Sequence, residues 1–384
     1  MILSLKILAT LALSLAVLSS RACETDDDCS LNGLCASNTC ICDPGWTSPD
    51  CGRLDFYPAT RNTGYNWTDV HLPSYYAARG NSSWGGQIIQ DRQDKTLFHM
   101  ILEHFPRGCG LSGWRPFSVI ARAESRTGPA GPYHHKQELF GAFRHNSATV
   151  WSPADEKYLM YTIGADTELP TTCRSFKWAN NVSVSTAPDI RGPWSPFAPV
   201  LKGTNPSAWP LWTPENPTPE IALALEDNVI YQAPTFFSAP WEGYEKIKSQ
   251  PWNTSDYSPT WTEDPFMWRD KRGHWHILAH WMIDITERNE KFPRVGAHLF
   301  SRTLTGNWTF KEQEAYNTTV EWTDGGRTDY LRRERPKLFF SGDGEVTPLY
   351  FSSGVQEFEG GGKSYTVVQP LGRGAGEFET GLGF

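Results

Sequence analysis

The feature that most constrains the fold of this chain is a short motif that recurs five times, at intervals of about fifty to seventy residues. In most copies a polar residue precedes a proline or a small residue, and apolar residues follow. The five copies are residues 83–88, 145–150, 215–221, 263–268 and 334–339. A motif that returns at such intervals indicates a repeat architecture.

Every copy is followed by a turn and a second short apolar segment. These segments are residues 91–100, 155–163, 227–231, 270–278 and 342–351. Short strands joined by Gly- and Asp-containing turns are typical of four-stranded blades arranged around an axis. The sequence therefore predicts an all-β fold, a five-bladed β-propeller.

The repeated polar position has a functional consequence in such a fold. The innermost strand of each blade lines the axis, so residues at its start should converge on one mouth. The converging pairs are Trp84 and Gly85, His145 and Asn146, Glu215 and Asn216, Glu263 and Asp264, and Glu334 and Arg335. A single Asn-Pro or Asp-Pro dipeptide is ordinary turn chemistry. Five copies in register favour a shared site.

The N-terminal segment has the features of a secretory signal peptide. An apolar run over 5–18 carries one early cation, Lys6, and ends near Ser20 and Ala22, small residues that fit a signal-peptidase site. We expect 1–22 to be a signal peptide, with a retained anchor as the weaker alternative, and no later stretch to span a membrane. A secreted, extracellular and monomeric glycoprotein is the expectation. The six sequons are at Asn66, Asn81, Asn181, Asn253, Asn307 and Asn317.

Charge excludes one class of partner. The chain has 384 residues, a net charge of −8 and 20% charged residues without a long run of either sign. A nucleic-acid-binding protein needs a basic patch or stripe, and none is present in the sequence, so we expect no nucleic-acid partner.

Eight cysteines divide into two groups. Six lie within 23–51, directly after the expected signal peptide, and Cys109 and Cys173 stand apart. A dense, even-numbered cluster in a secreted chain favours a disulfide framework over a metal site, because the cluster contains no histidine. Six cysteines allow fifteen pairings, so spacing does not decide among them.

The segment around Cys40-Ile-Cys42-Asp-Pro-Gly45-Trp46, with Asn32-Gly33 before Cys35, resembles an epidermal-growth-factor-like (EGF-like) module over 23–52. The resemblance implies the bonds Cys23–Cys35, Cys29–Cys40 and Cys42–Cys51, which leaves Cys109 to pair with Cys173. The acids at 26–28 match the calcium-binding form poorly, so we expect no calcium. Such a module implies a structural role or a protein contact.

Residues 54–384 resemble the five-bladed propellers of glycoside hydrolase family 43, above all at 263–268 and 333–336. The resemblance implies a polysaccharide or glycan as substrate, and we expect no cofactor. It also implies three acids in the funnel, from the first three blades. One Asp is the base, another tunes pKa values, and a Glu is the acid.

The sequence departs from that pattern. The first-blade position holds Trp84-Gly85-Gly86, with no carboxylate, and the second holds Asn146, which cannot ionise. Either the acids have moved around the ring, with Asp264 and Glu334 as a working pair for two-carboxylate hydrolysis, or the chain is a binding protein that lost catalysis.

The candidate residues follow from these positions. The catalytic candidates are Asp264, Glu334 and Glu215; the substrate-binding candidates are Trp84, His145, Asn146, Asn216, Glu263 and Arg335. A third hypothesis is a phosphate- or carboxylate-handling enzyme that uses Arg335 and Lys337. The alternating His274, His276 and His280 resemble a zinc face, but their apolar neighbours favour a buried strand, and we expect no metal.

Overall fold

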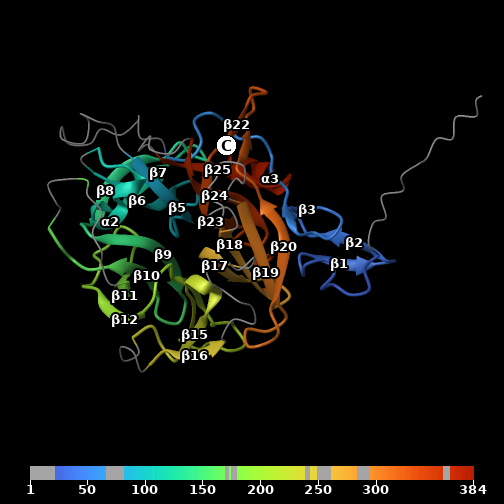
Figure 1. The fold of residues 1–384 in the computed structure, drawn as a ribbon, viewed down its shortest axis with the longest axis horizontal. Helices are drawn as coiled ribbons and strands as arrows, with labels where there is room; N and C mark the ends of the chain where they lie inside the picture. The colour runs from blue at the N-terminus through green and yellow to red at the C-terminus, as the bar shows by residue number, and fades with distance from the viewer. Residues whose placement is uncertain are drawn as a thin grey trace, which may run out of the picture.

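The computed structural model describes residues 22–65, 82–106, 108–168, 173, 180–237, 243–248, 261–282, 295–357 and 364–384. Figure 1 shows five sheets arranged around a central axis, with the small N-terminal module at one side of the ring. The fold is all-β, a five-bladed β-propeller with an EGF-like module, as the sequence predicts. None of the helices in the described ranges has the length and apolar character that crossing a bilayer requires.

Four blades have four antiparallel strands, and the fifth has three. Blade 1 contains β5 (Ser82–Gln90), β6 (Phe98–Phe105), β7 (Val119–Ser125) and β8 (His134–Phe140); blade 2 contains β9 (Arg144–Ser152), β10 (Lys157–Gly164), β11 (Asn181–Ala187) and β12 (Ala198–Lys202). Blade 3 contains β13 (Ser207–Pro210), β14 (Ile221–Ala224), β15 (Ile230–Ala233) and β16 (Glu245–Lys248). Blade 4 contains β17 (Thr262–Arg269), β18 (Trp275–Trp281), β19 (Val295–Ser301) and β20 (Thr309–Tyr316); blade 5 contains β23 (Arg332–Phe340), β24 (Pro348–Gln356) and β25 (Tyr365–Pro370).

The burial of a strand depends on its position within the blade. The second strands β6 and β24 are buried along their whole length, because each blade packs between two neighbours and both faces of its middle strands are covered. The outermost strand β8, with the sequence HHKQELF, has no fully buried residue. The core is therefore a ring of interfaces between blades.

The innermost strands share a bulge that explains the sequence repeat. One residue in or just before each strand has a left-handed backbone, and the residue that follows is a proline or a small residue. These residues are Gly85 (φ 67°), Asn146 (φ 55°), Asn205 (φ 52°), Asp264 (φ 52°) and Arg335 (φ 58°). In blades 1, 2, 4 and 5 the pairing register with the second strand shifts across this position.

The third copy of the motif was placed wrongly from the sequence. Glu215 and Asn216 are exposed in the connection 211–220 between β13 and β14, and Asn205-Pro206 occupies the third inner position. Both segments contain Asn-Pro, and turn chemistry does not distinguish them. Glu215 and Asn216 therefore do not reach the axis.

Polar side chains satisfy the free inner edges of the innermost strands. The Gln87 side chain accepts from the Thr149 amide (2.9 Å) and donates to its carbonyl (2.6 Å). Ser207 Oγ accepts from the Met267 amide (2.9 Å), and Ser352 Oγ donates to the Gly86 carbonyl (2.5 Å). Because a buried backbone group without a partner is costly, these contacts stabilise the junctions of blade 1 with blade 2, of blade 3 with blade 4 and of blade 5 with blade 1.

The N-terminal segment completes the ring. Phe56 bridges to Leu371 and Tyr65 to Thr366, both antiparallel, so the chain after the module runs beside β25. Two short strands, β21 (Thr319–Glu321) and β22 (Arg327–Asp329), form a separate hairpin before blade 5. The C-terminal helix α3 (Gly374–Leu382) packs its apolar residues against the core shared by blades 1 and 5.

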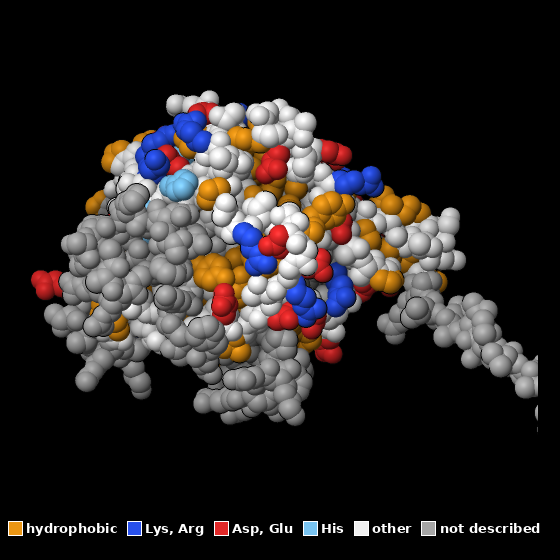
Figure 2. Space-filling view, turned by 90° about the horizontal axis from the view of Figure 1, so that it is seen from above, with side chains coloured by type: hydrophobic (Ala, Val, Ile, Leu, Met, Phe, Trp, Pro, Cys, Tyr) orange, Lys and Arg blue, Asp and Glu red, His pale blue; other side chains and the backbone are white. Residues whose placement is uncertain are grey.

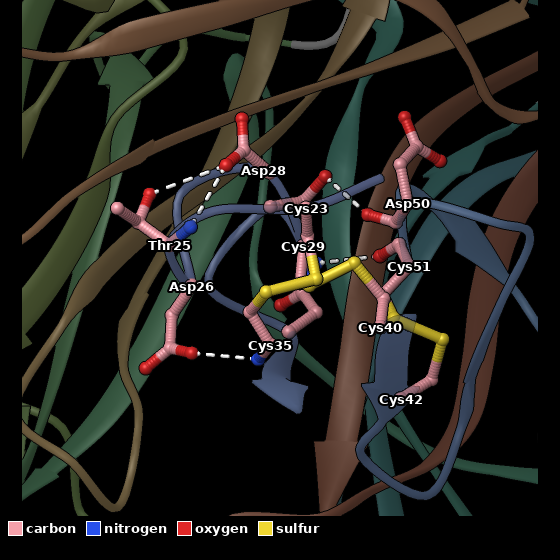
Figure 3. Close-up of a disulfide and its surroundings, with 12 residues drawn as sticks. Cys23, Thr25, Asp26, Asp28, Cys29, Cys35, Cys40, Cys42, Asp50 and Cys51 are labelled. Carbon is pink, nitrogen blue, oxygen red and sulfur yellow. Dashed lines mark hydrogen bonds between the residues drawn. A yellow bond between two sulfur atoms is a disulfide. The ribbon is translucent and has the colours of Figure 1, made fainter. Parts of the chain in front are cut away.

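The EGF-like module contains β1 (Gly33–Ala36), β2 (Thr39–Cys42), β3 (Trp46–Thr47) and β4 (Arg53–Leu54). Its disulfides are Cys23–Cys35, Cys29–Cys40 and Cys42–Cys51, the pairing that the resemblance implies (Figure 3). A fourth bond, Cys109–Cys173, joins the β6–β7 connection of blade 1 to the β10–β11 connection of blade 2.

The acids at 26–28 have structural contacts. Asp28 accepts from the amides of Glu24 and Thr25 (both 2.9 Å), and Asp26 accepts from the Cys35 amide (2.8 Å). The Asp27 carboxylate pairs with Arg302 (2.6 Å), on the propeller. Asp26 and Asp28 therefore stabilise the loops of the module, and Asp27 helps to attach the module to the propeller.

The module packs firmly against blade 4. Trp46 stacks on Trp268, with ring centroids 6.3 Å apart and an interplanar angle of 18°. The Arg272 guanidinium pairs with Asp43 (2.5 Å), and Lys311 pairs with Asp50 (3.0 Å). One hydrophobic cluster contains residues of both units, so the module extends the propeller core and is more than a tether.

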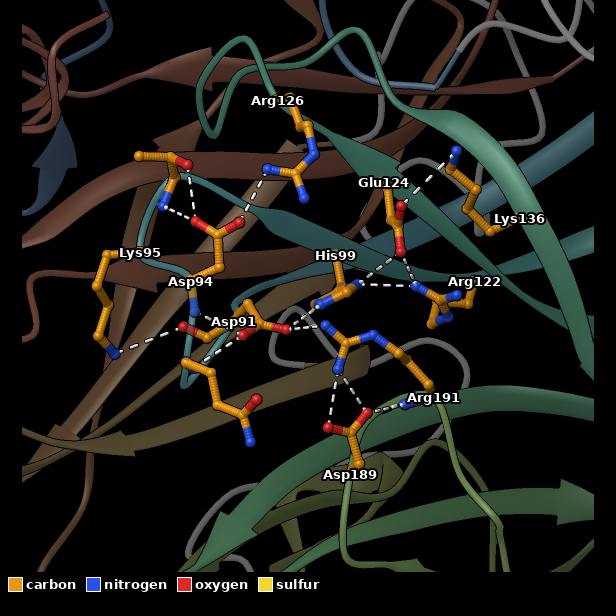
Figure 4. Close-up of polar contacts among 12 residues, drawn as sticks. Asp91, Asp94, Lys95, His99, Arg122, Glu124, Arg126, Lys136, Asp189 and Arg191 are labelled. Carbon is orange, nitrogen blue, oxygen red and sulfur yellow. Dashed lines mark hydrogen bonds and ion pairs between the residues drawn. The ribbon is translucent and has the colours of Figure 1, made fainter.

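Blades 1 and 2 are also joined by a buried polar network (Figure 4). His99 Nε2 contacts the Asp91 carboxylate (3.0 Å), which also pairs with Arg191 from the turn after β11. Arg122 bridges His99 Nδ1 (2.9 Å) and Glu124 (2.5 Å). Although burial opposes ionisation of Asp91, hydrogen bonds from His99 and two backbone amides lower its pKa.

Candidate active site at the mouth of the channel

An axial pocket of about 370 Å³ opens at the end of the channel where the innermost strands begin. Each blade contributes residues at or just before its bulge. These lining residues include Trp84, His145, Asn146, Thr204, Asn205, Glu263, Asp264, Glu334 and Arg335. The structure thus brings together seven of the nine predicted site residues; Glu215 and Asn216 do not line this pocket.

The acids gather on one side of the axial pocket. One donor atom each of Glu263, Asp264 and His280 lie within 4.8 Å of one another. Glu334 Oε1 lies 3.9 Å from His280 Nε2, and Glu226 also lines the pocket. The bulge and Pro265 hold Asp264 at the axis, while η3 (Glu226–Asn228) carries Glu226 to the same wall.

Crowding and burial change the acidity of two of these carboxyl groups. Burial, followed by repulsion from Glu226, Asp264 and Glu334, raises the pKa of Glu263 well above its usual value. Burial also raises the pKa of Asp264 to about 6; Glu334 adds to this rise, and Arg335 and Lys337 oppose it. Near neutral pH, the axial pocket therefore holds a protonated and an ionised carboxyl group together.

Arg335, on blade 5, contacts residues of three other blades at the base of the axial pocket. Its Nη1 donates to Glu103 Oε2 (3.3 Å), its Nη2 donates to His145 Nε2 (2.6 Å), and its Nε forms an ion pair with Asp264 Oδ1 (3.5 Å). Glu103 Oε1 in turn accepts from the Ser147 amide and hydroxyl (both 2.7 Å). The Arg335 guanidinium, which the sequence suggested as a binding group for a substrate carboxylate, is therefore already bonded to groups of the protein.

These contacts also define the state of His145. Because Nε2 accepts from Arg335, the ring proton lies on Nδ1, which donates to Ser118 Oγ (2.7 Å). Burial and then the positive charges of Arg335 and Arg115 lower the pKa of His145 well below its usual value. His145 is therefore a neutral positioning group for Arg335.

The missing first-blade carboxylate has a steric explanation. A Cβ at Gly85 would lie 3.2 Å from Arg335 Cδ and 3.3 Å from Glu103 Oε2, and the backbone there is left-handed. In blade 2, the Asn146 amide bonds to the Asn205 side chain. The Arg335–Glu103 pair fills the space where a first-blade acid would stand.

Several site residues had no signal in the repeat. Glu103 lies on the second strand of blade 1, and Glu226 follows β14. Trp114 and Arg115 come from the short helix α2 (Trp114–Phe117); Trp114 stacks on His145 with centroids 4.3 Å apart, and Arg115 donates to Asn180 (2.8 Å). Glu103 lies on a second strand and the other three lie in connections between strands, and the repeated inner-strand motif extends to neither.

The three histidines in and just before β18 do not form one metal face. His276 contacts His298 (3.0 Å) and the Asp270 carboxylate (3.5 Å), which His274 also approaches (3.4 Å). His280, further along the strand, faces the axial pocket. Glu263, Asp264 and His280 are, among the described residues and outside the disulfides, the set whose donor atoms lie close enough to share a cation.

Comparisons with known proteins agree with both parts of this architecture. A family model for a Teneurin-like EGF domain matches residues 25–53. A thermostable family-43 glycoside hydrolase is 10% identical with a TM-score of 0.50, and the match covers 81% of this chain and 92% of that chain. The fold is that of this glycoside hydrolase.

A second solved structure supports the same assignment. It is a family 117 glycoside hydrolase produced by the marine bacterium Zobellia galactanivorans, 11% identical with a TM-score of 0.50, over 84% of this chain and 90% of that chain. No curated protein matches the chain. Since identity this low speaks only for the fold, the chemistry has to be argued from the residues of the axial pocket.

Proposed function

We propose that this protein is a secreted glycosidase-type hydrolase that cleaves O-glycosidic bonds of an extracellular polysaccharide or glycan in the axial pocket. The observation that carries the proposal is the coexistence there of Glu263, with a strongly raised pKa, and Asp264, whose pKa of about 6 leaves it ionised at neutral pH. Such a pair provides a proton donor and a carboxylate without any further group.

Within this proposal Glu263 is the general acid and Asp264 the nucleophile. One carboxylate oxygen of each residue lies within 4.8 Å of the other, which is less than the 6.5–9.5 Å that inverting enzymes leave between their carboxyl groups for a water, so we assign the retaining route. Asp264 attacks the anomeric carbon as Glu263 gives its proton to the leaving oxygen. Glu263 then takes a proton from the water that cleaves the glycosyl ester. Burial first, and then repulsion from Glu226, Asp264 and Glu334, raises the pKa of Glu263 and keeps it protonated.

The surroundings suit a sugar ring. Trp84 and Trp114 form part of the wall of the axial pocket, although Trp84 is only 2% exposed, and Asn146 and Asn180 place amide groups on the same wall. A volume of about 370 Å³ is in the range of small-molecule sites, about 300–1,000 Å³. We infer that one end of a glycan chain enters here.

The secreted location is part of the proposal. Four disulfides without a free cysteine among the described residues are typical of an oxidising compartment. Of the predicted glycosylation sites, Asn307 and Asn317 are exposed and Asn181 is half-buried. Asn66, Asn81 and Asn253, like residues 1–21 of the expected signal peptide, lie outside the described residues.

A digest of polysaccharides tests the proposal. Arabinan, arabinoxylan, galactan and glucan would be incubated with the native protein and with Glu263→Gln and Asp264→Asn, and released sugars measured by mass spectrometry. We expect each variant to lose about 10²–10⁴-fold in rate. Glu215→Gln, at an exposed loop position, is the matched control and should keep full activity.

The outcomes separate the hypotheses. NMR of the fresh product should show retained anomeric configuration, and inversion would refute Asp264 as nucleophile. Full activity of Asp264→Asn would remove it from the mechanism. Retention of the native protein on one polysaccharide without any product would favour the alternative, a binding protein. The Arg335–Glu103 pair in place of a first-blade acid is the observation that supports that alternative.

A further inference from the structure

A second cavity, of about 360 Å³, lies at the opposite end of the channel. Its lining residues follow the bulge of each innermost strand, whereas those of the axial pocket precede or form the bulge. Since the innermost strand is the first of each blade, all five run the same way along the axis, and the two cavities open at opposite ends. We call this second cavity the rear cavity.

The two cavities are separated by a constriction. The space between them amounts to about 20 Å³ and is lined by Gly85, Glu103, Asn146, Asp264 and Arg335, among others. Lys337 lines both this constriction and the rear cavity. A ligand in the rear cavity would therefore reach Lys337 without entering the axial pocket.

The walls of the rear cavity are aromatic. Trp151, Trp209 and Trp212 are each half-buried, so part of every indole faces open space. Phe266 and Phe340 stack with centroids 6.1 Å apart and an interplanar angle of 17°. These rings offer flat apolar surfaces around one opening.

Trp151 is held in place before any ligand arrives. The guanidinium of Arg92 lies 3.5 Å from the centroid of one face of its ring. Tyr158 meets the same indole edge-on, with centroids 5.0 Å apart. A preformed aromatic wall lowers the entropy that binding would cost.

Few polar groups in the rear cavity remain available. The Gln87 amide is bonded to the Thr149 backbone, and Ser207 Oγ accepts from the Met267 amide. Two groups are left. The Thr149 hydroxyl is buried without a hydrogen-bond partner in the described part of the chain, and Lys337 has no hydrogen bond there either, only the ring of Phe266 at 5.4 Å.

The charge of Lys337 is retained near neutral pH. Burial lowers its pKa to about 8, and the carboxylates of Asp264 and Glu103 oppose that change. A buried ammonium without a hydrogen-bonded partner is unfavourable, so an anion beside it would be stabilised. One cation and one hydroxyl are too few to satisfy the many hydroxyls of a sugar, but they match one carboxylate.

We propose that the rear cavity is a binding site for a small aromatic carboxylate, whose carboxylate meets Lys337 and Thr149 and whose ring lies between Trp209, Trp212 and Phe340. The site is separate from the proposed active site and does not depend on the hydrolase activity. A flat apolar body fills the aromatic walls, and the single charge fixes its orientation.

The test uses 2-naphthoate, its uncharged analogue 2-naphthamide and methyl β-xyloside as probes of the secreted protein. Titration calorimetry and tryptophan fluorescence report binding. We expect saturable binding of naphthoate, at least tenfold tighter than that of naphthamide, and none of the xyloside. Lys337→Met should abolish the preference for the charged probe, and Thr149→Val should weaken naphthoate binding several-fold.

Two further variants keep the test decisive if Lys337→Met fails to fold. Trp212→Ala, in the connection 211–220, should weaken both naphthyl probes. Phe237→Ala removes an aromatic residue that is 75% exposed outside the cavity and should change nothing. Equal affinity for naphthoate and naphthamide, tighter binding of the xyloside, or unchanged binding by Trp212→Ala would overturn the proposal.

Discussion

Arg335 lies at the centre of the proposed active site, and the cost of removing its guanidinium can be worked out from its contacts. The side chains of Arg335, Glu103 and Asp264 are only 11%, 3% and 9% exposed. In Arg335→Met both carboxylates lose a buried cationic partner. Removing one partner of a buried ion pair costs about 3–5 kcal/mol of unfolding free energy.

A surface pair gives the matched control. Arg302 pairs with Asp27 at 2.6 Å, but the two side chains are 50% and 46% exposed. Solvent screens such a pair, so Arg302→Gln should cost about 0–1 kcal/mol. Denaturant unfolding followed by tryptophan fluorescence measures both variants under the same conditions.

The same substitution should also change the pH dependence of hydrolysis. Arg335 opposes the rise in the pKa of Asp264, which stands at about 6 in the native protein. Without the guanidinium, Asp264 should ionise at higher pH, so the acid limb of kcat/KM should move upward.

Two results would refute this reasoning about Arg335. One is a loss of stability in Arg335→Met no larger than that of Arg302→Gln. The other is an acid limb that stays in place. The double variant Arg335→Met/Glu103→Gln should recover part of the lost stability, because no unpaired buried charge remains at Glu103.

Three further predictions concern stability and fold. Burial lowers the pKa of His104 to about 3 and that of His298 well below its usual value, so both histidines bind protons more readily in the unfolded state than in the folded one. The free energy of unfolding should therefore fall as the pH drops below about 6.5, by roughly 2 kcal/mol for His104 at pH 5. A denaturant midpoint that stays constant from pH 7 to pH 5 would contradict this. Trp46→Ala, which removes the stack on Trp268, should lower the melting temperature of the whole protein, whereas an unchanged propeller transition would mean that the module is only a tether. Gly85→Asp, which places an acid at the first-blade position, should lower the melting temperature and should not raise the rate of hydrolysis, because the new Cβ would press on Arg335 and Glu103. A higher rate of hydrolysis would show that the axial pocket accepts a first-blade acid.

Much of the fold could be read from local patterns. Cysteine spacing and the Cys40-Ile-Cys42 segment predicted the module, and its disulfides have the implied pairing. The inner positions of blades 1, 2, 4 and 5 were predicted because a bulge demands the same turn chemistry each time. The third was misplaced because Asn205-Pro206 and Asn216-Pro217 satisfy that chemistry equally.

The sequence by itself determined the class of fold, the disulfide-rich module and the acids Asp264 and Glu334 at the axis. These depend on periodicity, turn residues and spacing, which act over a few residues. Only the tertiary structure decided that Arg335 pairs with Glu103, 232 residues away, and that Glu226 and Glu263 share one wall. The pKa values of the carboxyl groups in the axial pocket depend on burial and on charged neighbours that are distant in sequence. Only the closed ring of blades brings these groups together and removes them from water.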